Sequence, residues 1–260
     1  MIGVFDSGLG GLTVVKELLN YLPEYQIIYF GDTARLPYGT KQASLIQQWS
    51  KDNSRWLIQN GAELIIIACH TASSWAFDLL HEELEVPVFD VLTPGLKEAL
   101  TTSQNRKIGV IGTPGMIESN IYSKRLEESG QIASLHMQAC PLFVPIIEEG
   151  WMDRPGTKEI AQEYLIPLRE KGIDTLVMGC THYPLLRDII TEIMGPKINI
   201  IDPANALALN VKDFLQKNPV FKKSDQDHEF YFSAKPYHLK LISRLCLNRN
   251  INGQVIYNNK

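Results

Sequence analysis

Two cysteines occur in nearly the same local sequence, and this repetition is the clearest chemical signal in the chain. Residues 63–71 read ELIIIACHT and residues 174–182 read DTLVMGCTH. In both segments an acidic residue precedes an apolar run, which ends in a small residue, a cysteine, and a threonine with a histidine. Because thiolates are reactive near neutral pH once their pKa is lowered, Cys69 and Cys180 could form a pair of proton-transfer groups. With one thiol on each face of a carbon, a proton could leave one side while another arrives on the opposite side.

The other two cysteines, Cys140 and Cys246, lack this setting, so we interpret them as small buried apolar residues. The chain has no Cys-x-x-Cys pair, and disulfides are not expected in a reducing compartment. The cysteines and histidines are numerous enough for zinc, but their spacing is not that of a zinc finger, so no metal is predicted. The sequence carries no recognisable signal for pyridoxal phosphate. We therefore expect proton transfer without a cofactor.

Short apolar runs alternate with amphipathic stretches along most of the chain. The runs are nearly continuous, as in strands that are buried on both faces of a parallel sheet. They comprise Ile2–Phe5, Gln26–Phe30, Leu64–Ala68, Val86–Phe89, Ile108–Ile111, Thr175–Met178 and Ile198–Ile201. Between the first two runs, apolar residues from Leu12 to Leu22 recur at the i, i+3 and i+4 spacing of a helix. This alternation predicts an α/β fold.

The duplicated cysteine segment indicates two similar α/β domains, each built on an open parallel sheet. Ligands of such sheets bind beyond the carboxyl ends of the strands. Both Cys69 and Cys180 fall at that end of a predicted strand. If the two domains face each other, the two thiols meet across one cleft.

Two turn-forming segments are the best candidates for domain boundaries, namely Thr93-Pro94-Gly95 and Asp202-Pro203-Ala204. A further strand is predicted near the end of the chain, at Glu229–Ser233, and it would rejoin the first domain. We therefore predict a first, discontinuous domain of residues 1–93 plus 206–260 and a second domain of residues 94–205.

The bulk composition narrows the class of protein. Of the 260 residues, 45% are hydrophobic and 21% are charged, which is ordinary for a soluble globular protein. The net charge is -4 and no basic block is present, so nucleic acid is not an expected partner. The N-terminal segment has neither the basic nor the apolar region of a signal peptide, and no apolar run is long enough to span a bilayer. We expect a cytoplasmic protein that does not contact a membrane.

Five motifs stand out along the chain, namely Phe5–Gly11, Gly31–Gly39, Ala68–Ser73, Cys140–Pro145 and Gly179–Leu186. Together they resemble the motifs of the glutamate racemases, within the aspartate/glutamate racemase family, and they occur in that family's order. The resemblance implies two α/β domains related by pseudo-twofold symmetry, with the active site in the cleft between them. It also implies cofactor-independent interconversion of L- and D-glutamate, which would supply D-glutamate for peptidoglycan synthesis. A homodimer is expected.

The same resemblance assigns roles to individual residues. Cys69 would act on D-glutamate with help from Asp6, and Cys180 would act on L-glutamate with help from His182 and Glu148. The residues that would bind the substrate are Ser7, Tyr38, Gly39, His70, Thr71, Thr113 and Thr181.

Two positions depart from the family pattern. The family usually has asparagine after the first cysteine, where this chain has His70, and a threonine in the helix start where this chain has Met116. An imidazole can donate and accept hydrogen bonds as an amide does, and it becomes cationic near its unperturbed pKa of about 6.5. We therefore expect His70 to compensate for a carboxylate contact that is lost at Met116.

Several other interpretations stay open. Asp6 could merely cap a helix, Asp32 and Glu148 could be solvated surface acids, and the adjacent Glu149 could take the role of Glu148. Tyr38 could simply close a turn. The chain could instead be an aspartate racemase of the same superfamily, although that group usually carries an acid at the position of His182. It could also be a non-catalytic or moonlighting member that binds a protein such as DNA gyrase.

The glycine-rich segment Gly8–Gly11 is an incomplete match to a dinucleotide-binding loop. The fingerprint requires a third glycine at the position that Thr13 occupies. We expect this loop to present backbone amides to an anion at the start of a helix, and a substrate carboxylate is a suitable anion.

Overall fold

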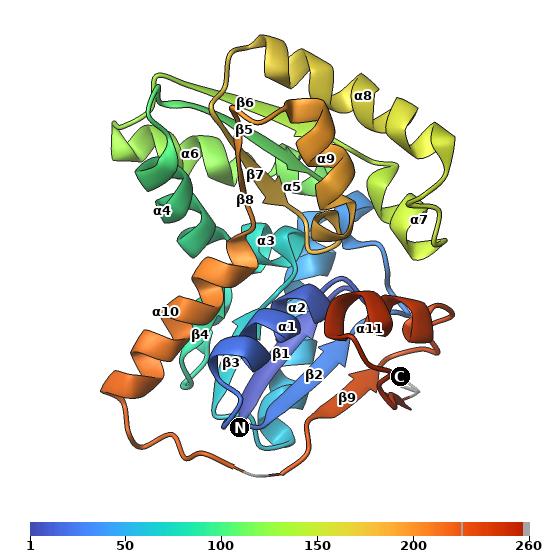
Figure 1. Cartoon of the computed structure of the whole chain (residues 1–260). Coiled ribbons are helices and arrows are strands. Elements are labelled where there is room, and N and C mark those ends of the chain that lie inside the picture. The colour runs from blue at the N-terminus through green and yellow to red at the C-terminus, as the bar shows by residue number, and fades with distance from the viewer. Residues whose placement is uncertain (225, 257–260) are drawn as a thin grey trace.

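A computed structural model of the protein describes residues 1–224 and 226–256. Its strands form two separate parallel sheets (Figure 1). The first sheet has the order β10-β9-β2-β1-β3-β4 and the second has the order β6-β5-β7-β8. The first contains β1 (Ile2–Asp6), β2 (Ile27–Gly31), β3 (Leu64–Ile67), β4 (Val88–Asp90), β9 (Glu229–Phe232) and β10 (Gln254–Val255). The second contains β5 (Lys107–Gly112), β6 (Ser134–Ala139), β7 (Thr175–Gly179) and β8 (Asn199–Ile201).

Helices cover both sheets (Figure 1). Those before β5 are α1 (Leu12–Tyr21), α2 (Ala43–Gln59), α3 (His70–Glu83) and α4 (Leu92–Thr102). Between β5 and β8, the helices are α5 (Pro114–Glu118), α6 (Ile121–Ser129), α7 (Phe143–Glu148), α8 (Pro155–Glu170) and α9 (Arg187–Met194). The chain then continues through α10 (Pro203–Lys217) and α11 (Leu239–Leu247). Two short 3-10 helices, η1 (Tyr38–Thr40) and η2 (Tyr183–Leu186), lie in loops.

The prediction of an α/β fold with two parallel sheets is confirmed. The central strands β1, β2, β3 and β7 are buried along their whole length, which explains why they appear in the sequence as continuous apolar runs. Two strands escaped the sequence analysis. The first, β6, is an edge strand whose residues are all half-buried and include polar side chains, and the second, β10, is only two residues long.

The chain returns to the first sheet near its C-terminus, as predicted for Glu229–Ser233. The strand β9 pairs in parallel with β2, and it places Phe232 beside Gly31. The predicted domains, residues 1–93 plus 206–260 and residues 94–205, stay a prediction. Both of their boundaries fall inside helices. The predicted turn Thr93-Pro94-Gly95 is instead the first turn of α4, and the second boundary lies in α10, which contacts β4 of the first sheet and β7 of the second.

The carboxyl ends of the two sheets face each other, and the loops that follow them are in contact. The Thr13 hydroxyl donates to the Thr181 carbonyl at 2.9 Å, which joins α1 to the loop after β7. A Cβ atom on Gly10 would lie 2.4 Å from Nδ1 of His182, so only glycine permits this approach. No helix within residues 1–224 and 226–256 has the length and apolar character needed to cross a membrane.

Candidate active site

A narrow cavity between the facing sheets contains both cysteines of the duplicated motif. Its wall includes all the predicted substrate-binding residues, which are Ser7, Tyr38, Gly39, His70, Thr71, Thr113 and Thr181, together with Cys69, Cys180 and His182. Its volume is about 20 Å³, which is room for about one water molecule. The structure is therefore closed around this point, and the loops must separate before a molecule as large as an amino acid can enter.

Cys69 follows β3 and is the residue that precedes the first turn of α3. Its thiol is buried and donates a hydrogen bond to the hydroxyl of Ser7, with 3.6 Å between Sγ and Oγ. Burial raises the pKa of this thiol to about 12, and the nearby Asp6 carboxylate contributes to the rise, whereas the Ala72 amide and Ser7 oppose it. In the closed structure Cys69 is therefore a protonated thiol at neutral pH and can act as a proton donor.

Cys180 follows β7 and belongs to a chain of three polar groups. Its Sγ lies 3.9 Å from Nδ1 of His182, and Nε2 of the same ring lies 2.6 Å from Oε1 of Glu148. Burial lowers the pKa of His182, but hydrogen bonds to Cys180 and Glu148 and the negative charge of both outweigh burial, so the pKa lies well above its usual value. The imidazole is therefore cationic at neutral pH, and its Nδ1 lies where it can exchange a proton with Sγ of Cys180.

Glu148 is not the freely solvated acid that the sequence left open. Its side chain is 18% exposed, because α7 directs it toward His182. Glu149, the other candidate for this role, has a side chain that is 62% exposed and lies 4.0 Å from Nε2 of His238. Only the first of the two glutamates therefore contacts the histidine that lines the cavity.

Asp6 ends β1 and lies just behind the cavity wall, fully buried. One carboxylate oxygen accepts from the Gly8 amide at 2.9 Å, and the other accepts from the Thr181 hydroxyl at 3.2 Å. Burial raises the pKa of Asp6, whereas the cationic His182 and the hydrogen bonds lower it. The carboxyl group thus connects the loop after β1 with the loop that carries Cys180, which is more than a helix cap would do.

The position where the family has asparagine is occupied by a buried, neutral histidine. His70 is 3% exposed, and neither of its ring nitrogens has a hydrogen-bond partner among the described residues. Burial lowers its pKa to about 3. The expectation that His70 becomes cationic near pH 6.5 is therefore wrong for the closed site, because the ring is too far from water to hold a charge.

The second departure, Met116, does not line the cavity. Its side chain is buried under the second sheet, and its methyl group occupies the space beside Gly112 and Gly179. Thr113 caps the start of α5 through the Met116 amide and also lies 2.8 Å, hydroxyl to hydroxyl, from Thr71. Of Thr113 and Met116, only the threonine thus presents a polar group to the cavity.

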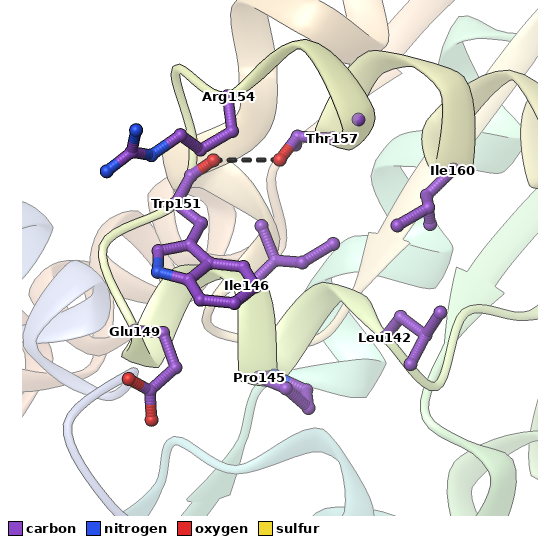
Figure 2. A pocket seen from close by; sticks show the side chains of 9 residues that line it. Leu142, Pro145, Ile146, Glu149, Trp151, Arg154, Thr157 and Ile160 are labelled. Atoms are coloured by element: carbon purple, nitrogen blue, oxygen red, sulfur yellow. Dashed lines mark hydrogen bonds between the residues drawn. The ribbon is translucent and has the colours of Figure 1, made fainter.

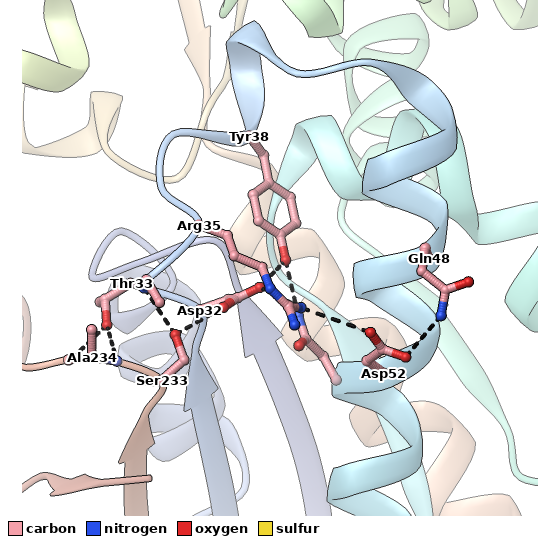
Figure 3. A network of polar contacts seen from close by, with 10 residues as sticks. Asp32, Thr33, Arg35, Tyr38, Gln48, Asp52, Ser233 and Ala234 are labelled. Carbon is pink, nitrogen blue, oxygen red and sulfur yellow. Dashed lines mark hydrogen bonds and ion pairs between the residues drawn. The ribbon is translucent and has the colours of Figure 1, made fainter. Parts of the chain in front are cut away.

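Tyr38 and Gly39 form part of the wall, but the tyrosine hydroxyl points away from the cavity. It donates to the Asp32 carboxylate (Figure 3). It also accepts from the Asn53 side chain at 3.1 Å. Asp32 is 1% exposed, so it is not a solvated surface acid. Gly39 is tightly enclosed, because a Cβ atom there would lie 2.6 Å from the Cβ of Thr113.

Three apolar wall residues were not identified as site residues from the sequence, namely Leu36, Pro37 and Val144. All three lie inside the quoted motifs, which is the signal that could have marked them. Cys140 is buried behind the wall, where its carbonyl accepts from the Tyr183 hydroxyl. No group of three or more potential metal ligands comes together within residues 1–224 and 226–256.

A larger groove of about 640 Å³ is lined by α7, the start of α8 and the loop between them (Figure 2). Its wall is mostly apolar, with Leu142, Ile146 and the half-exposed Trp151, and the Thr157 hydroxyl holds the Trp151 carbonyl at 2.7 Å. Neither thiol lines this groove. The two thiols of the duplicated motif come together at the small cavity between the sheets.

Comparison with known proteins gives extensive matches. A family model described as Asp/Glu/Hydantoin racemase matches residues 2–211. A glutamate racemase from Geobacter metallireducens is 42% identical over 237 residues, which cover 90% of this chain and 88% of that protein.

Two crystal structures extend this similarity to the fold. A glutamate racemase isoform from Bacillus anthracis superposes with a TM-score of 0.93 at 34% identity, over 98% of this chain and 97% of that one. A glutamate racemase from Francisella tularensis in complex with D-glutamate superposes with a TM-score of 0.90 at 35% identity, over 98% and 96%. The similarity of fold therefore extends over both sheets.

Proposed function

The chain belongs to the Asp/Glu/Hydantoin racemase family and is an amino-acid racemase, an isomerase, and from this premise we propose that it interconverts L- and D-glutamate without a cofactor. One observation carries the proposal. Two thiols from equivalent strand ends of two facing sheets line a single cavity. A carbon held between them has a proton-transfer group on each face.

In the L-to-D direction we infer that the Cys180 thiolate removes the α-proton of L-glutamate. The electron pair left on the α-carbon is delocalised into the α-carboxylate, and the Cys69 thiol donates its proton to the opposite face. The product is D-glutamate, with a thiol at Cys180 and a thiolate at Cys69, and the roles are exchanged in the reverse direction. The protonated state of Cys69 and the cationic state of His182 beside Cys180 support this starting arrangement.

We infer that the polar wall holds the substrate. The carboxylates and the ammonium group can be met by the ring nitrogens of His70, which have no partner in the described part of the chain, and by the hydroxyls of Ser7, Thr71, Thr113 and Thr181. Since the cavity holds only about one water molecule, binding requires the loops to separate, and the contact between Thr71 and Thr113 is among those that must break.

The wider role follows from the resemblance of the motifs. We propose that the protein supplies D-glutamate for peptidoglycan synthesis, acts in the cytoplasm and forms a homodimer. Sedimentation or light scattering of the purified protein measures the last point directly, and a monomer at the concentrations of the assay would contradict it.

Circular dichroism of the purified protein with L-glutamate, D-glutamate, L-aspartate and D-aspartate tests the proposed reaction. We expect loss of the optical signal from both glutamate enantiomers and a much slower change with aspartate. Faster turnover of aspartate would identify an aspartate racemase instead. No turnover of any of the four, with capture of DNA gyrase in a parallel binding assay, would favour a non-catalytic member.

A further inference from the structure

The wall of the cavity includes one loop whose support lies outside the cavity. The segment that follows β2 lines the cavity with Leu36, Pro37, Tyr38 and Gly39. It is closely fitted on both sides, because a Cβ atom on Gly8 would meet the Leu36 side chain at 3.0 Å and Gly39 packs against Thr113. A small displacement of this loop therefore changes the shape of the cavity.

The buried carboxylate of Asp32 is the centre of the contacts that hold this loop (Figure 3). It accepts from the Tyr38 hydroxyl on one oxygen and from the Ser233 hydroxyl on the other, the latter at 2.8 Å. The Arg35 guanidinium lies 3.4 Å from the first oxygen. The Ser233 oxygen also accepts from the Ala34 amide at 2.9 Å, so the loop is tied to the end of β9. Hydrogen bonds to an ionised group of this kind are stronger than neutral ones.

The hydroxyl of Tyr38 is fully engaged by these contacts. It donates to Asp32 and accepts from Asn53, and the ring lies 5.3 Å from the ring of Trp49. Burial and the Asp32 charge raise the pKa of Tyr38 well above its usual value, so the hydroxyl stays protonated and remains a donor. Tyr38 therefore presents its ring and main chain to the cavity, and the direction of its hydroxyl is decided by Asp32.

We propose that Asp32 is a positioning residue for the racemisation: by holding the Tyr38 hydroxyl it sets the Leu36–Gly39 wall, and its loss impairs substrate binding rather than proton transfer. This inference rests on the proposed function for its kinetic consequence. The anchoring of the loop is a separate physical claim and can be measured without a substrate.

The kinetic test compares Asp32→Asn with Asp52→Asn. Asp52 makes the same kind of contact with Arg35, at 3.9 Å, but its side chain is 36% exposed and none of its hydrogen bonds among the described residues reaches Tyr38. The side-chain amide that replaces the Asp32 carboxylate keeps one accepting oxygen, so it cannot accept from both Tyr38 and Ser233. We expect Asp32→Asn to raise KM for glutamate roughly tenfold with kcat within about twofold, because one hydrogen bond to a charge is lost. Asp52→Asn should leave both constants unchanged.

Two further measurements separate positioning from general destabilisation. Tyr38→Phe should raise KM as Asp32→Asn does, and the double variant should have the KM of the worse single variant, because both changes break the same contact. Hydrogen exchange by mass spectrometry should show faster exchange of amides 33–40 in Asp32→Asn and not in Asp52→Asn.

Three results would overturn the proposal. A fall in kcat of roughly a hundredfold or more at unchanged KM would assign Asp32 to the proton transfer itself. If the KM increases of the two single variants multiply in the double variant, Asp32 does not act through Tyr38. Unchanged hydrogen exchange of amides 33–40 in Asp32→Asn would show that Asp32 does not anchor the loop. If the unmodified protein and Asp52→Asn both fail to racemise glutamate, the proposed function fails, and the exchange measurement still decides whether Asp32 anchors the loop.

Discussion

Glu148→Gln gives the most direct test of the Cys180 side of the site. The substitution keeps the size of the side chain and removes its charge from a position 2.6 Å from Nε2 of His182. At an effective dielectric constant near 20, that attraction is about 6 kcal/mol before desolvation is subtracted. Hydrogen bonds to charged groups contribute only about 1.5–3 kcal/mol to measured differences. We therefore expect a loss of about 2 kcal/mol, which corresponds to roughly 30-fold in kcat/KM.

The expected loss of kcat/KM in Glu148→Gln is constrained by the equilibrium of the reaction. The two enantiomers have equal free energy, so the equilibrium constant is unity and kcat/KM must fall equally in both directions. In the proposed mechanism, however, the slowed step is proton transfer at Cys180, the thiol that would remove the α-proton of L-glutamate. With α-deuterated substrates we therefore expect the isotope effect to increase for L-glutamate more than for D-glutamate.

The pH dependence follows from the raised pKa of His182. The unfolded chain has the lower pKa, so the stabilisation by the paired imidazolium is fully present below about pH 6.5 and is lost as the pH rises through the raised value in the folded protein. Removing the Glu148 charge lowers the pKa of His182 in the folded protein. The alkaline limb of kcat/KM, and the alkaline loss of thermal stability, should both move to lower pH.

Glu149→Gln is the matched control, because it makes the same chemical change one residue away on an exposed side chain. It should behave as the unmodified protein in every assay. A Glu148→Gln protein that keeps kcat/KM within about threefold, or a Glu149→Gln protein that loses as much activity, would refute the assignment of Glu148 as the partner of His182.

Other expected outcomes concern the thiols, the two departures from the family pattern, and cofactors. Cys69→Ala and Cys180→Ala should each abolish racemisation while the folded circular dichroism spectrum is kept, whereas Cys140→Ala and Cys246→Ala should remain active; near-normal turnover in either of the first two would contradict its role. Because the pKa of His70 is lowered to about 3, the unfolded chain binds a proton at this histidine between about pH 6.5 and pH 3, whereas the folded protein does not. The free energy of unfolding therefore falls as the pH drops through this range. In a thermal unfolding series, His70→Asn should make this fall smaller. The same variant should raise KM for glutamate more than Met116→Thr does, whereas Met116→Thr should chiefly lower the free energy of unfolding, by about 2 kcal/mol, since that side chain fills the core. Racemisation should persist in EDTA and without added pyridoxal phosphate. If EDTA abolishes the activity and zinc restores it, the reaction depends on a metal.

The sequence alone was sufficient to predict an α/β fold with two parallel sheets and to place Cys69 and Cys180 at the ends of two strands. Strands that are buried on both faces are apolar along their whole length, so the local sequence indicates where they lie. The duplicated motif then placed Cys69 and Cys180 at the ends of two such strands. The half-buried edge strand β6 lacked such a run and was missed, since exposure permits polar residues such as His136 and Gln138.

What only the tertiary structure decided is the chemical state and direction of the side chains around the thiols. His70 is neutral because it is buried away from water, and the Tyr38 hydroxyl is directed by Asp32 together with Asn53. Asp32 is itself held by Ser233, 201 residues away along the chain. The pKa of a buried group and the partner of a hydrogen bond depend on which distant atoms come within a few ångströms of it, and no local pattern of residue types contains that information.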